Sequence, residues 1–112
     1  MRFAIPLTGN RLCSHFGHCE RFALIDTDSE AKMIVGKEEV AAPAHQPGLL
    51  PRWLADRGAN VVVAGGMGPR AQGLFAERGI EVVVGAPQEA PEIIVQAYLA
   101  GTLEIGENEC DH

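Results

Sequence analysis

Apolar positions in the first 40 residues either alternate with polar ones or run together in short stretches, and turn residues separate these stretches. Residues 21–27 follow the two-residue period of a strand, with Phe22 and Leu24 on one face. Residues 2–7 are almost continuously apolar, and residues 32–40 repeat the alternation more weakly. The three stretches predict three strands joined as an antiparallel meander.

Beyond this point the pattern changes to an alternation of helices and strands. Residues 47–57, 69–78 and 91–100 predict helices, because each segment is followed by a glycine that suits the position past a helix end. Residues 60–64 and 80–84 are continuous apolar runs, which are typical of strands buried on both faces.

The predicted order of elements is therefore β-β-β-α-β-α-β-α, in a single domain of residues 1–112. This order indicates an α/β fold in which helices pack on a mixed five-stranded sheet. The first and third strands of a meander run in the same direction. If the two later strands are parallel to the first, four strands end at the same end of the sheet, where open α/β sheets usually bind ligands.

Composition and charge exclude several classes of function. The formal net charge is −6, and the sequence has no run of Lys or Arg, so we expect no nucleic-acid partner. The apolar runs are of strand length, which predicts no membrane association, and we identify no signal peptide. We therefore expect a cytoplasmic protein. In that reducing compartment the three cysteines are better interpreted as metal ligands or redox groups than as disulfides.

The most reactive stretch of the sequence is residues 13–19, here named the Cys/His loop. It contains Cys13, His15, His18 and Cys19, whose sulfur and nitrogen atoms are soft metal ligands. The spacing contains no C-x-x-C pair, which disfavours a zinc ribbon and excludes a thioredoxin-type redox motif. A loop with one buried cysteine and two solvated histidines is the alternative interpretation.

Three further residues are candidate ligands. Cys110 and His112 form a second pair at the end of the sequence, although the residues alone favour a frayed tail. His45 follows the third predicted strand, so the expected topology brings it toward the Cys/His loop. A lone histidine before a helix is more often an exposed or capping residue.

A glycine-rich segment, here named the glycine turn, precedes the second predicted helix. It consists of Gly65, Gly66, Met67 and Gly68, and Arg70 follows in the helix. The chain is too short for a complete dinucleotide-binding fold. Backbone N–H groups at a helix N-terminus nevertheless attract anions, so the turn and Arg70 are a candidate anion or cofactor site. A tight β–α turn that needs glycine for packing is the alternative.

Several motifs in order along the chain resemble one known family. They are SHFGHCERF at residues 14–22, PGLLP at 47–51, AGGMGPRA at 64–71, GIEVVVG at 79–85 and the terminal Cys-Asp-His. Together they resemble the dinitrogenase iron–molybdenum cofactor biosynthesis family, the group related to NifX, NafY and the C-terminal part of NifB.

The resemblance implies a ribonuclease-H-like fold and a small protein that binds or carries an iron–sulfur or molybdenum-containing cluster without catalysis. Metallocluster assembly or acceptor proteins are the implied partners. Carried over by position, the implied ligands are His15, His18, Cys19, Cys110 and His112. Cys13 lies outside the family pattern.

Two other functions compete with a cluster carrier. One is an interaction or regulatory module with a single Zn or Fe ion and no cluster transfer. The other is a nuclease on a ribonuclease-H-like scaffold, which needs several carboxylates at one end of the sheet to hold Mg²⁺. Asp26, Asp28 and Glu30 are predicted at the end away from the Cys/His loop, where they are expected to be solvated turn residues.

Overall fold

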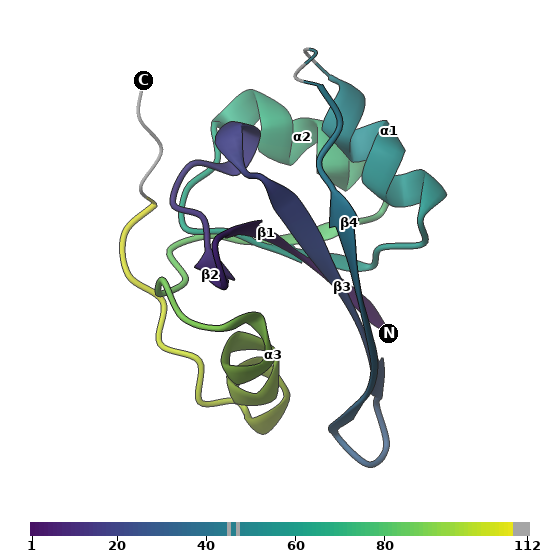
Figure 1. Ribbon diagram of the computed structural model, residues 1–112, viewed down its shortest axis with the longest axis vertical. Coiled ribbons are helices and arrows are strands. Elements are labelled where there is room, and N and C mark those ends of the chain that lie inside the picture. Colours follow the sequence, from purple (N-terminus) through teal and green to yellow (C-terminus); the bar gives the residue numbers. More distant parts are fainter. Residues whose placement is uncertain (45, 47, 109–112) are drawn as a thin grey trace.

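A mixed β-sheet forms the middle layer of the protein in the computed structural model, which describes residues 1–44, 46 and 48–108 (Figure 1). The strands are β1 (Arg2–Thr8), β2 (Arg11–Leu12), β3 (Arg21–Asp28), β4 (Met33–Ala41), β5 (Val61–Val63) and β6 (Glu81–Val83). Their order across the sheet is β4-β3-β1-β5-β6, and β2 pairs with the end of β1. β3 is antiparallel to β1 and β4, whereas β5 is parallel to β1 and β6.

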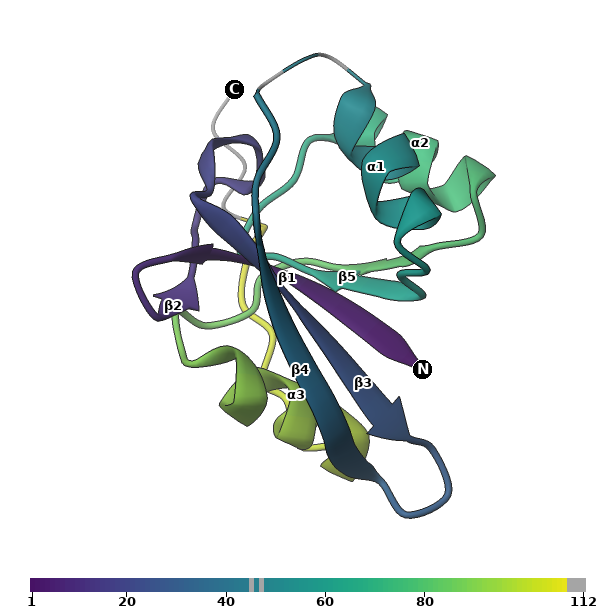
Figure 2. The ribbon, with the colours of Figure 1, turned by 45° about the vertical axis from the view of Figure 1, so that its right-hand side comes forward.

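Helices cover both faces of the sheet. They are α1 (Leu49–Asp56), α2 (Pro69–Glu77) and α3 (Pro91–Ala100), and a single 3-10 turn, η1 (Phe16–His18), lies in the Cys/His loop. Helices α1 and α2 lie on one face and α3 on the other (Figures 1 and 2). Proline is the first residue of α2 and of α3, where its missing N–H costs no hydrogen bond.

The central strand β1 separates two apolar cores because its side chains alternate between the two faces. Phe3 and Ile5 point to the α3 side, where they pack with Ile94 of that helix. Ala4 points to the other side, into the core that contains Leu54 of α1 and Phe75 of α2. All six side chains are fully buried, and burial on both faces of the sheet explains why β1 is almost continuously apolar in sequence.

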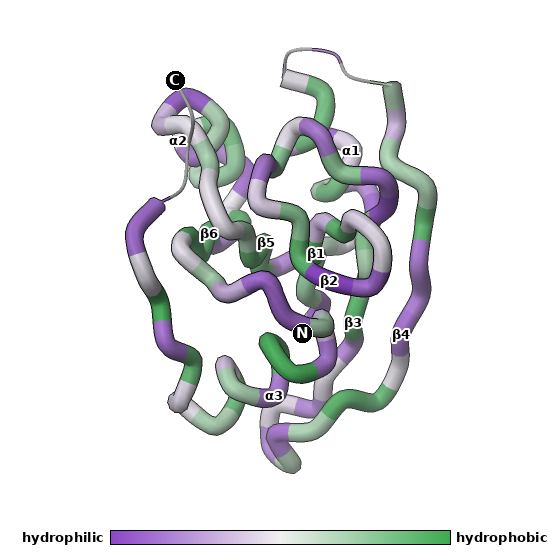
Figure 3. Tube along the Cα trace, turned by 60° about the vertical axis from the view of Figure 1, so that its left-hand side comes forward, coloured by the Kyte–Doolittle hydropathy of each residue, from purple (hydrophilic) through white to green (hydrophobic). Residues whose placement is uncertain are grey.

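The outer strand β4 is much more exposed than its neighbour β3. Figure 3 shows a hydrophilic stretch in the middle of this strand, where Lys37, Glu38 and Glu39 occur in sequence. Lys37 forms ion pairs with Glu39 and with Glu92 of α3. Charged side chains on an outer strand disfavour pairing with another chain.

The structure confirms the predicted strands and helices to within one or two residues, apart from the bounds of α1, whose predicted start at Pro47 lies outside the described residues. The predicted strand number of five is wrong, because the sheet formed by the described residues has six strands. The additional strand, β2, consists of two residues that fold back so that Leu12 pairs with Leu7. Gly9, at a φ of 64°, makes this tight turn possible, and a two-residue strand is too short to show a hydrophobic period.

Strand direction brings the predicted loops together. Because β4, β5 and β6 all run in the direction of β1, four strands finish at one end of the sheet. We call this the carboxyl end. In the part of the chain that the structure describes, no helix is long and apolar enough to span a membrane.

Candidate metal-binding site at the carboxyl end of the sheet

Backbone hydrogen bonds fix the Cys/His loop to the carboxyl end of the sheet. The Cys13 N–H donates to the Pro6 carbonyl at 2.8 Å, and the Glu20 N–H donates to the Leu7 carbonyl at 2.9 Å. The Ala42 N–H, just past β4, donates to the Glu20 carbonyl at 3.1 Å. Both ends of the loop are therefore tied to β1, and its exit is also tied to the end of β4.

Phe16 anchors the middle of the loop in the core. Its side chain is only 7% exposed. Its ring packs edge-on against Phe22 of β3 and Phe75 of α2, with centroid separations of 5.9 and 5.5 Å. Burying an aromatic side chain provides the apolar free energy that holds this polar loop in one conformation.

The two histidines that flank Phe16 and Gly17 are exposed. The His18 N–H donates to the His15 carbonyl at 3.0 Å, which closes the η1 turn and carries both imidazoles on one short segment. Their ring centroids are 6.4 Å apart. Two nitrogen ligands are thus presented close together at the surface.

The two loop cysteines differ in environment. Cys19 is half-buried, and burial, followed by the neighbouring Cys13, raises the pKa of its thiol to about 12. The metal-free thiol is therefore protonated at neutral pH, and a metal ion that binds it must displace the proton. Cys13 is buried, and its thiol donates to the His15 carbonyl at 3.2 Å, a contact that supports the turn.

The glycine turn lies at the same end of the sheet, between β5 and α2. Gly65, Gly66 and Met67 are buried, whereas Arg70 is exposed. The Met67 N–H donates to the side-chain oxygen of Asn108 at 2.9 Å. One of the amides predicted to bind an anion is therefore already paired with the protein itself.

The segment after α3 also reaches the carboxyl end of the sheet. Residues 102–108, here named the strap, run back past β6, and the Gly106 N–H donates to the Gly85 carbonyl at 2.7 Å. The sequence did not decide whether this tail returns. The sequence analysis did not predict the contacts of Asn108. The strap has no hydrophobic period, and Met67, which Asn108 contacts, is 41 positions away in sequence.

The fold thus brings the Cys/His loop, the glycine turn and the strap to one end of the sheet. His45, Cys110 and His112 lie outside the described residues, so their role as ligands stays a prediction. In residues 1–44, 46 and 48–108, no three His, Cys, Asp or Glu side chains are grouped closely enough to hold a metal ion. The donor types fit a soft metal, but the described part of the chain does not preassemble a complete site.

A hollow of about 390 Å³ lies beside the strap, and its lining includes no residue of the Cys/His loop. Its lining comes from residues 85–87 and 104–107. The charged side chains in this lining are those of Glu104 and Glu107, which repel anions. The hollow is therefore a poor candidate for an anionic cluster.

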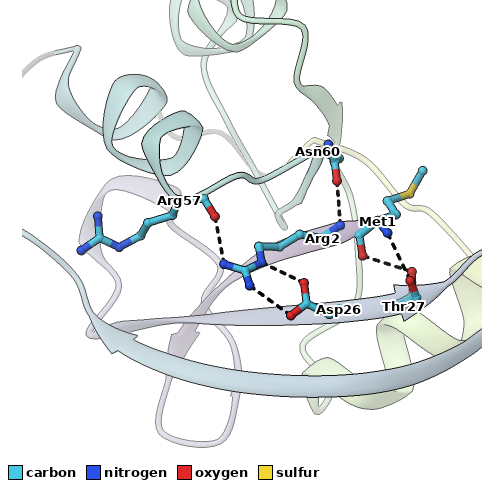
Figure 4. Close-up of polar contacts among 6 residues, drawn as sticks. All are labelled: Met1, Arg2, Asp26, Thr27, Arg57 and Asn60. Atoms are coloured by element: carbon cyan, nitrogen blue, oxygen red, sulfur yellow. Dashed lines mark hydrogen bonds and ion pairs between the residues drawn. The ribbon is translucent and has the colours of Figure 1, made fainter.

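Asp26 and Asp28, the carboxylates considered above for a nuclease, lie at the opposite end of the sheet. Arg2 donates to both carboxylate oxygens of Asp26, at 2.8 and 3.1 Å, and to the Arg57 carbonyl at 2.9 Å (Figure 4). The hydrogen bonds from Arg2 lower the pKa of Asp26. Asp28 accepts hydrogen bonds from the Glu30 and Ala31 N–H groups within its own turn. The prediction that these acids lie at the end of the sheet away from the Cys/His loop is confirmed. Their hydrogen bonds connect parts of the fold to one another.

The family of this chain follows from comparison with known proteins. A model of the dinitrogenase iron-molybdenum cofactor family matches residues 1–101. The chain belongs to this family. The matched residues include the whole Cys/His loop and the glycine turn, and the match confirms the resemblance inferred from the motifs.

One relative matches nearly the whole chain in sequence, and two solved structures match it in fold. The uncharacterized protein MJ0580 of Methanocaldococcus jannaschii is 32% identical over 109 residues, which cover 93% of this chain and 90% of that protein. The crystal structure of PH0822 has a TM-score of 0.88 at 30% identity and covers 97% of both chains. The apo form of the orange protein from Desulfovibrio gigas has a TM-score of 0.72 at 25% identity and covers 96% of this chain and 93% of that one.

Proposed function

We propose that this protein binds an iron–sulfur or molybdenum-containing cluster at the carboxyl end of the sheet and carries it to an acceptor protein. The observation that supports the proposal is the position of His15, His18 and Cys19. Three soft ligands stand on one anchored loop, at the end where four strands of a cofactor-family fold terminate.

Cys19 and the two histidines are the proposed direct ligands. Thiolate and imidazole ligands bind iron, copper and molybdenum–sulfur species more tightly than they bind hard cations such as Mg²⁺. Cys110 and His112 are proposed to complete the donor set from the tail. The exposed Arg70 and the N-terminus of α2 add positive potential at the same end of the sheet, which favours an anionic cluster.

We further propose a carrier rather than an enzyme. The imidazoles are exposed, and an exposed ligand set allows a bound cluster to leave for another protein. A cluster-assembly protein and an acceptor are the partners that this role requires, in the cytoplasm. We also place the fold in the ribonuclease-H-like class, with support from an antiparallel β4-β3-β1 half followed by parallel β5 and β6.

The test is reconstitution without oxygen. Purified protein is incubated with iron, molybdate and sulfide, desalted, and analysed for metal, acid-labile sulfide and visible absorption. We expect bound sulfide and a charge-transfer band, both lost in Cys19→Ala because the ligand thiolate is missing. Asp56→Asn, a change at an exposed carboxylate in α1, serves as the matched control and should retain both signals.

Two other results decide against the cluster. One zinc or iron ion for each chain without sulfide would support the single-ion module instead. Absence of bound metal under all of these conditions would contradict both functions.

A further inference from the structure

Side-chain contacts join the chain just before the Cys/His loop to the chain just after it. Gly9 lies in the turn between β1 and β2, and both of its backbone groups bond to side chains that follow Cys19. The Gly9 N–H donates to the Glu20 carboxylate at 2.9 Å, and the Arg21 guanidinium donates to the Gly9 carbonyl. The entrance and the exit of the loop are therefore fastened to each other.

The outer strand β4 holds Arg21 in turn. The Arg21 Nε–H donates to one carboxylate oxygen of Glu39 at 3.0 Å, and the other oxygen of Glu39 pairs with Lys37 at 3.2 Å. The side chains of Arg21 and Glu39 are 33% and 38% exposed. A guanidinium that bonds to a carboxylate and to a carbonyl at the same time has a fixed orientation. Arg21 therefore connects β4 to the turn at Gly9.

These contacts lie next to a proposed metal ligand. Cys19 directly precedes Glu20 and is two residues from Arg21, so the Cα atoms of Cys19 and Arg21 are at most about 7 Å apart. The backbone of Glu20 is also fixed, because its N–H donates to the Leu7 carbonyl and its carbonyl accepts from the Ala42 N–H. The residues that follow Cys19 are thus held by their main chain and by their side chains.

We propose that Glu20 and Arg21 are positioning residues that hold Cys19 in its metal-binding place by fastening the loop exit to Gly9. This inference rests on the proposed function, because it concerns a ligand of that metal-binding site. Without these contacts the loop has more conformations to lose when Cys19 binds a metal, so the affinity for metal falls.

The first measurement needs no metal. Exchange of the Gly9 amide proton with water is measured by NMR in the wild type, Glu20→Ala and Glu20→Gln. We expect roughly fivefold faster exchange in Glu20→Ala, which removes the acceptor of the Gly9 N–H. Glu20→Gln keeps a side-chain oxygen at the same chain length and should exchange like the wild type. Unchanged exchange in Glu20→Ala would overturn the proposed contact.

The second measurement uses Co²⁺ as the probe, with thiolate-to-cobalt absorption as the readout of affinity. Loss of an outer residue that orients metal ligands typically weakens metal binding by about tenfold or more. We expect this loss in Arg21→Ala and in Glu20→Ala, and wild-type affinity in Glu20→Gln.

Arg2→Ala is the matched control. Arg2 also joins a carboxylate of a neighbouring strand to a loop carbonyl, but at the end of the sheet away from the Cys/His loop. Urea denaturation should show similar losses of stability in Arg2→Ala and Arg21→Ala. The Co²⁺ affinity of Arg2→Ala should stay within about twofold of the wild type, because distant sites act independently.

The other outcomes separate the two proposals. Equal weakening of Co²⁺ binding by Arg2→Ala and Arg21→Ala would show a general effect of lost stability and overturn the positioning role. Wild-type affinity in Arg21→Ala and Glu20→Ala, with binding still abolished by Cys19→Ala, would overturn the positioning role and leave the proposed function intact. A wild-type protein that binds no Co²⁺, while the Gly9 amide still responds to Glu20→Ala, would contradict the proposed function, and the positioning role with it.

Discussion

The two ends of the sheet use polar residues in opposite ways. At the end near Arg2, charged groups satisfy each other: the guanidinium joins Asp26 of β3 to the Arg57 carbonyl, and the Asn60 side chain accepts from the Arg2 N–H at 2.7 Å (Figure 4). At the carboxyl end, backbone hydrogen bonds and the ring of Phe16 hold the Cys/His loop, and the two imidazoles face outward.

The difference indicates which polar groups serve the fold and which serve a ligand. The polar groups near Arg2 bond to one another and so link β1, β3 and the connection between α1 and β5. They therefore stabilise the fold. A loop fixed by its backbone and by one apolar anchor leaves its side-chain donors oriented toward an incoming group. Changes at the first end should therefore affect stability alone, and changes at the second should separate stability from metal binding.

The largest expected effect is on the apolar anchor of the carboxyl end. Phe16→Ala should lower the free energy of unfolding by about 3–5 kcal/mol, because it leaves a cavity between Phe22 and Phe75. Urea denaturation measures the change. Phe16→Leu, which refills part of the space, should cost less than half as much. A loss below about 1 kcal/mol for the alanine variant would show that the loop does not depend on this anchor.

A smaller effect is expected where the strap meets the sheet. Gly85→Ala should destabilise the protein by about 2–3 kcal/mol, from left-handed backbone strain together with the clash against Gly106. Gly101→Ala is the matched control, because Gly101 also has a positive φ, of 73°, but nothing lies within 4 Å of its Cβ position. Thermal unfolding of both variants isolates the contribution of the strap, and equal destabilisation would contradict close packing at Gly85.

The ion pair at the opposite end should contribute about 0.5–1 kcal/mol, because both side chains are partly exposed to water. Asp26→Asn removes it. Since Arg2 lowers the pKa of Asp26 in the folded protein, the stabilisation is present above the unfolded pKa of about 4 and is lost as pH falls through the folded value.

Urea denaturation at several pH values should therefore show a wild-type advantage over Asp26→Asn at pH 7 that shrinks in acid. Metal binding by Asp26→Asn should match the wild type. An advantage that grew toward low pH would contradict the assigned direction of the pKa shift.

An equally small effect on stability is expected at the proposed ligand itself. Cys19→Ala should lower the free energy of unfolding by about 0.5–1 kcal/mol, because the thiol is half-buried and its loss removes little buried apolar volume. Because its pKa is raised to about 12, the wild-type thiol should also react slowly with iodoacetamide at pH 8 when metal is absent. Mass spectrometry of the labelled peptides measures this rate, and rapid labelling would show that the thiol is more exposed and more acidic than the structure indicates.

The sequence predicted the helices and strands that can be recognised from the residues within each segment. Strands such as β5 are continuous apolar runs, and α3 is bounded by Pro91 and Gly101, so periodicity and breakers were sufficient. The strand β2 was missed because two residues carry no period. The Gly9-Asn10 dipeptide between Leu7 and Leu12 is a hairpin signal that identifies it in retrospect.

The site was predictable only as far as topology allowed. Parallel strands explain why the Cys/His loop and the glycine turn share one end of the sheet. The clamp of Asn108 on Met67 joins residues 41 positions apart, and no local pattern announces it. The burial that raises the pKa of Cys19 is likewise a product of tertiary packing.

The most direct test of the account is to locate a bound metal by paramagnetic NMR. Co²⁺ is added to isotope-labelled protein, and signal loss is mapped along the backbone. We predict loss centred on residues 15–19 and 66–68, with the signals of Arg2, Asp26 and Asn60 retained. Signal loss centred on Asp26 and Asp28, or spread evenly over the chain, would contradict the assignment of the carboxyl end as the metal-binding end.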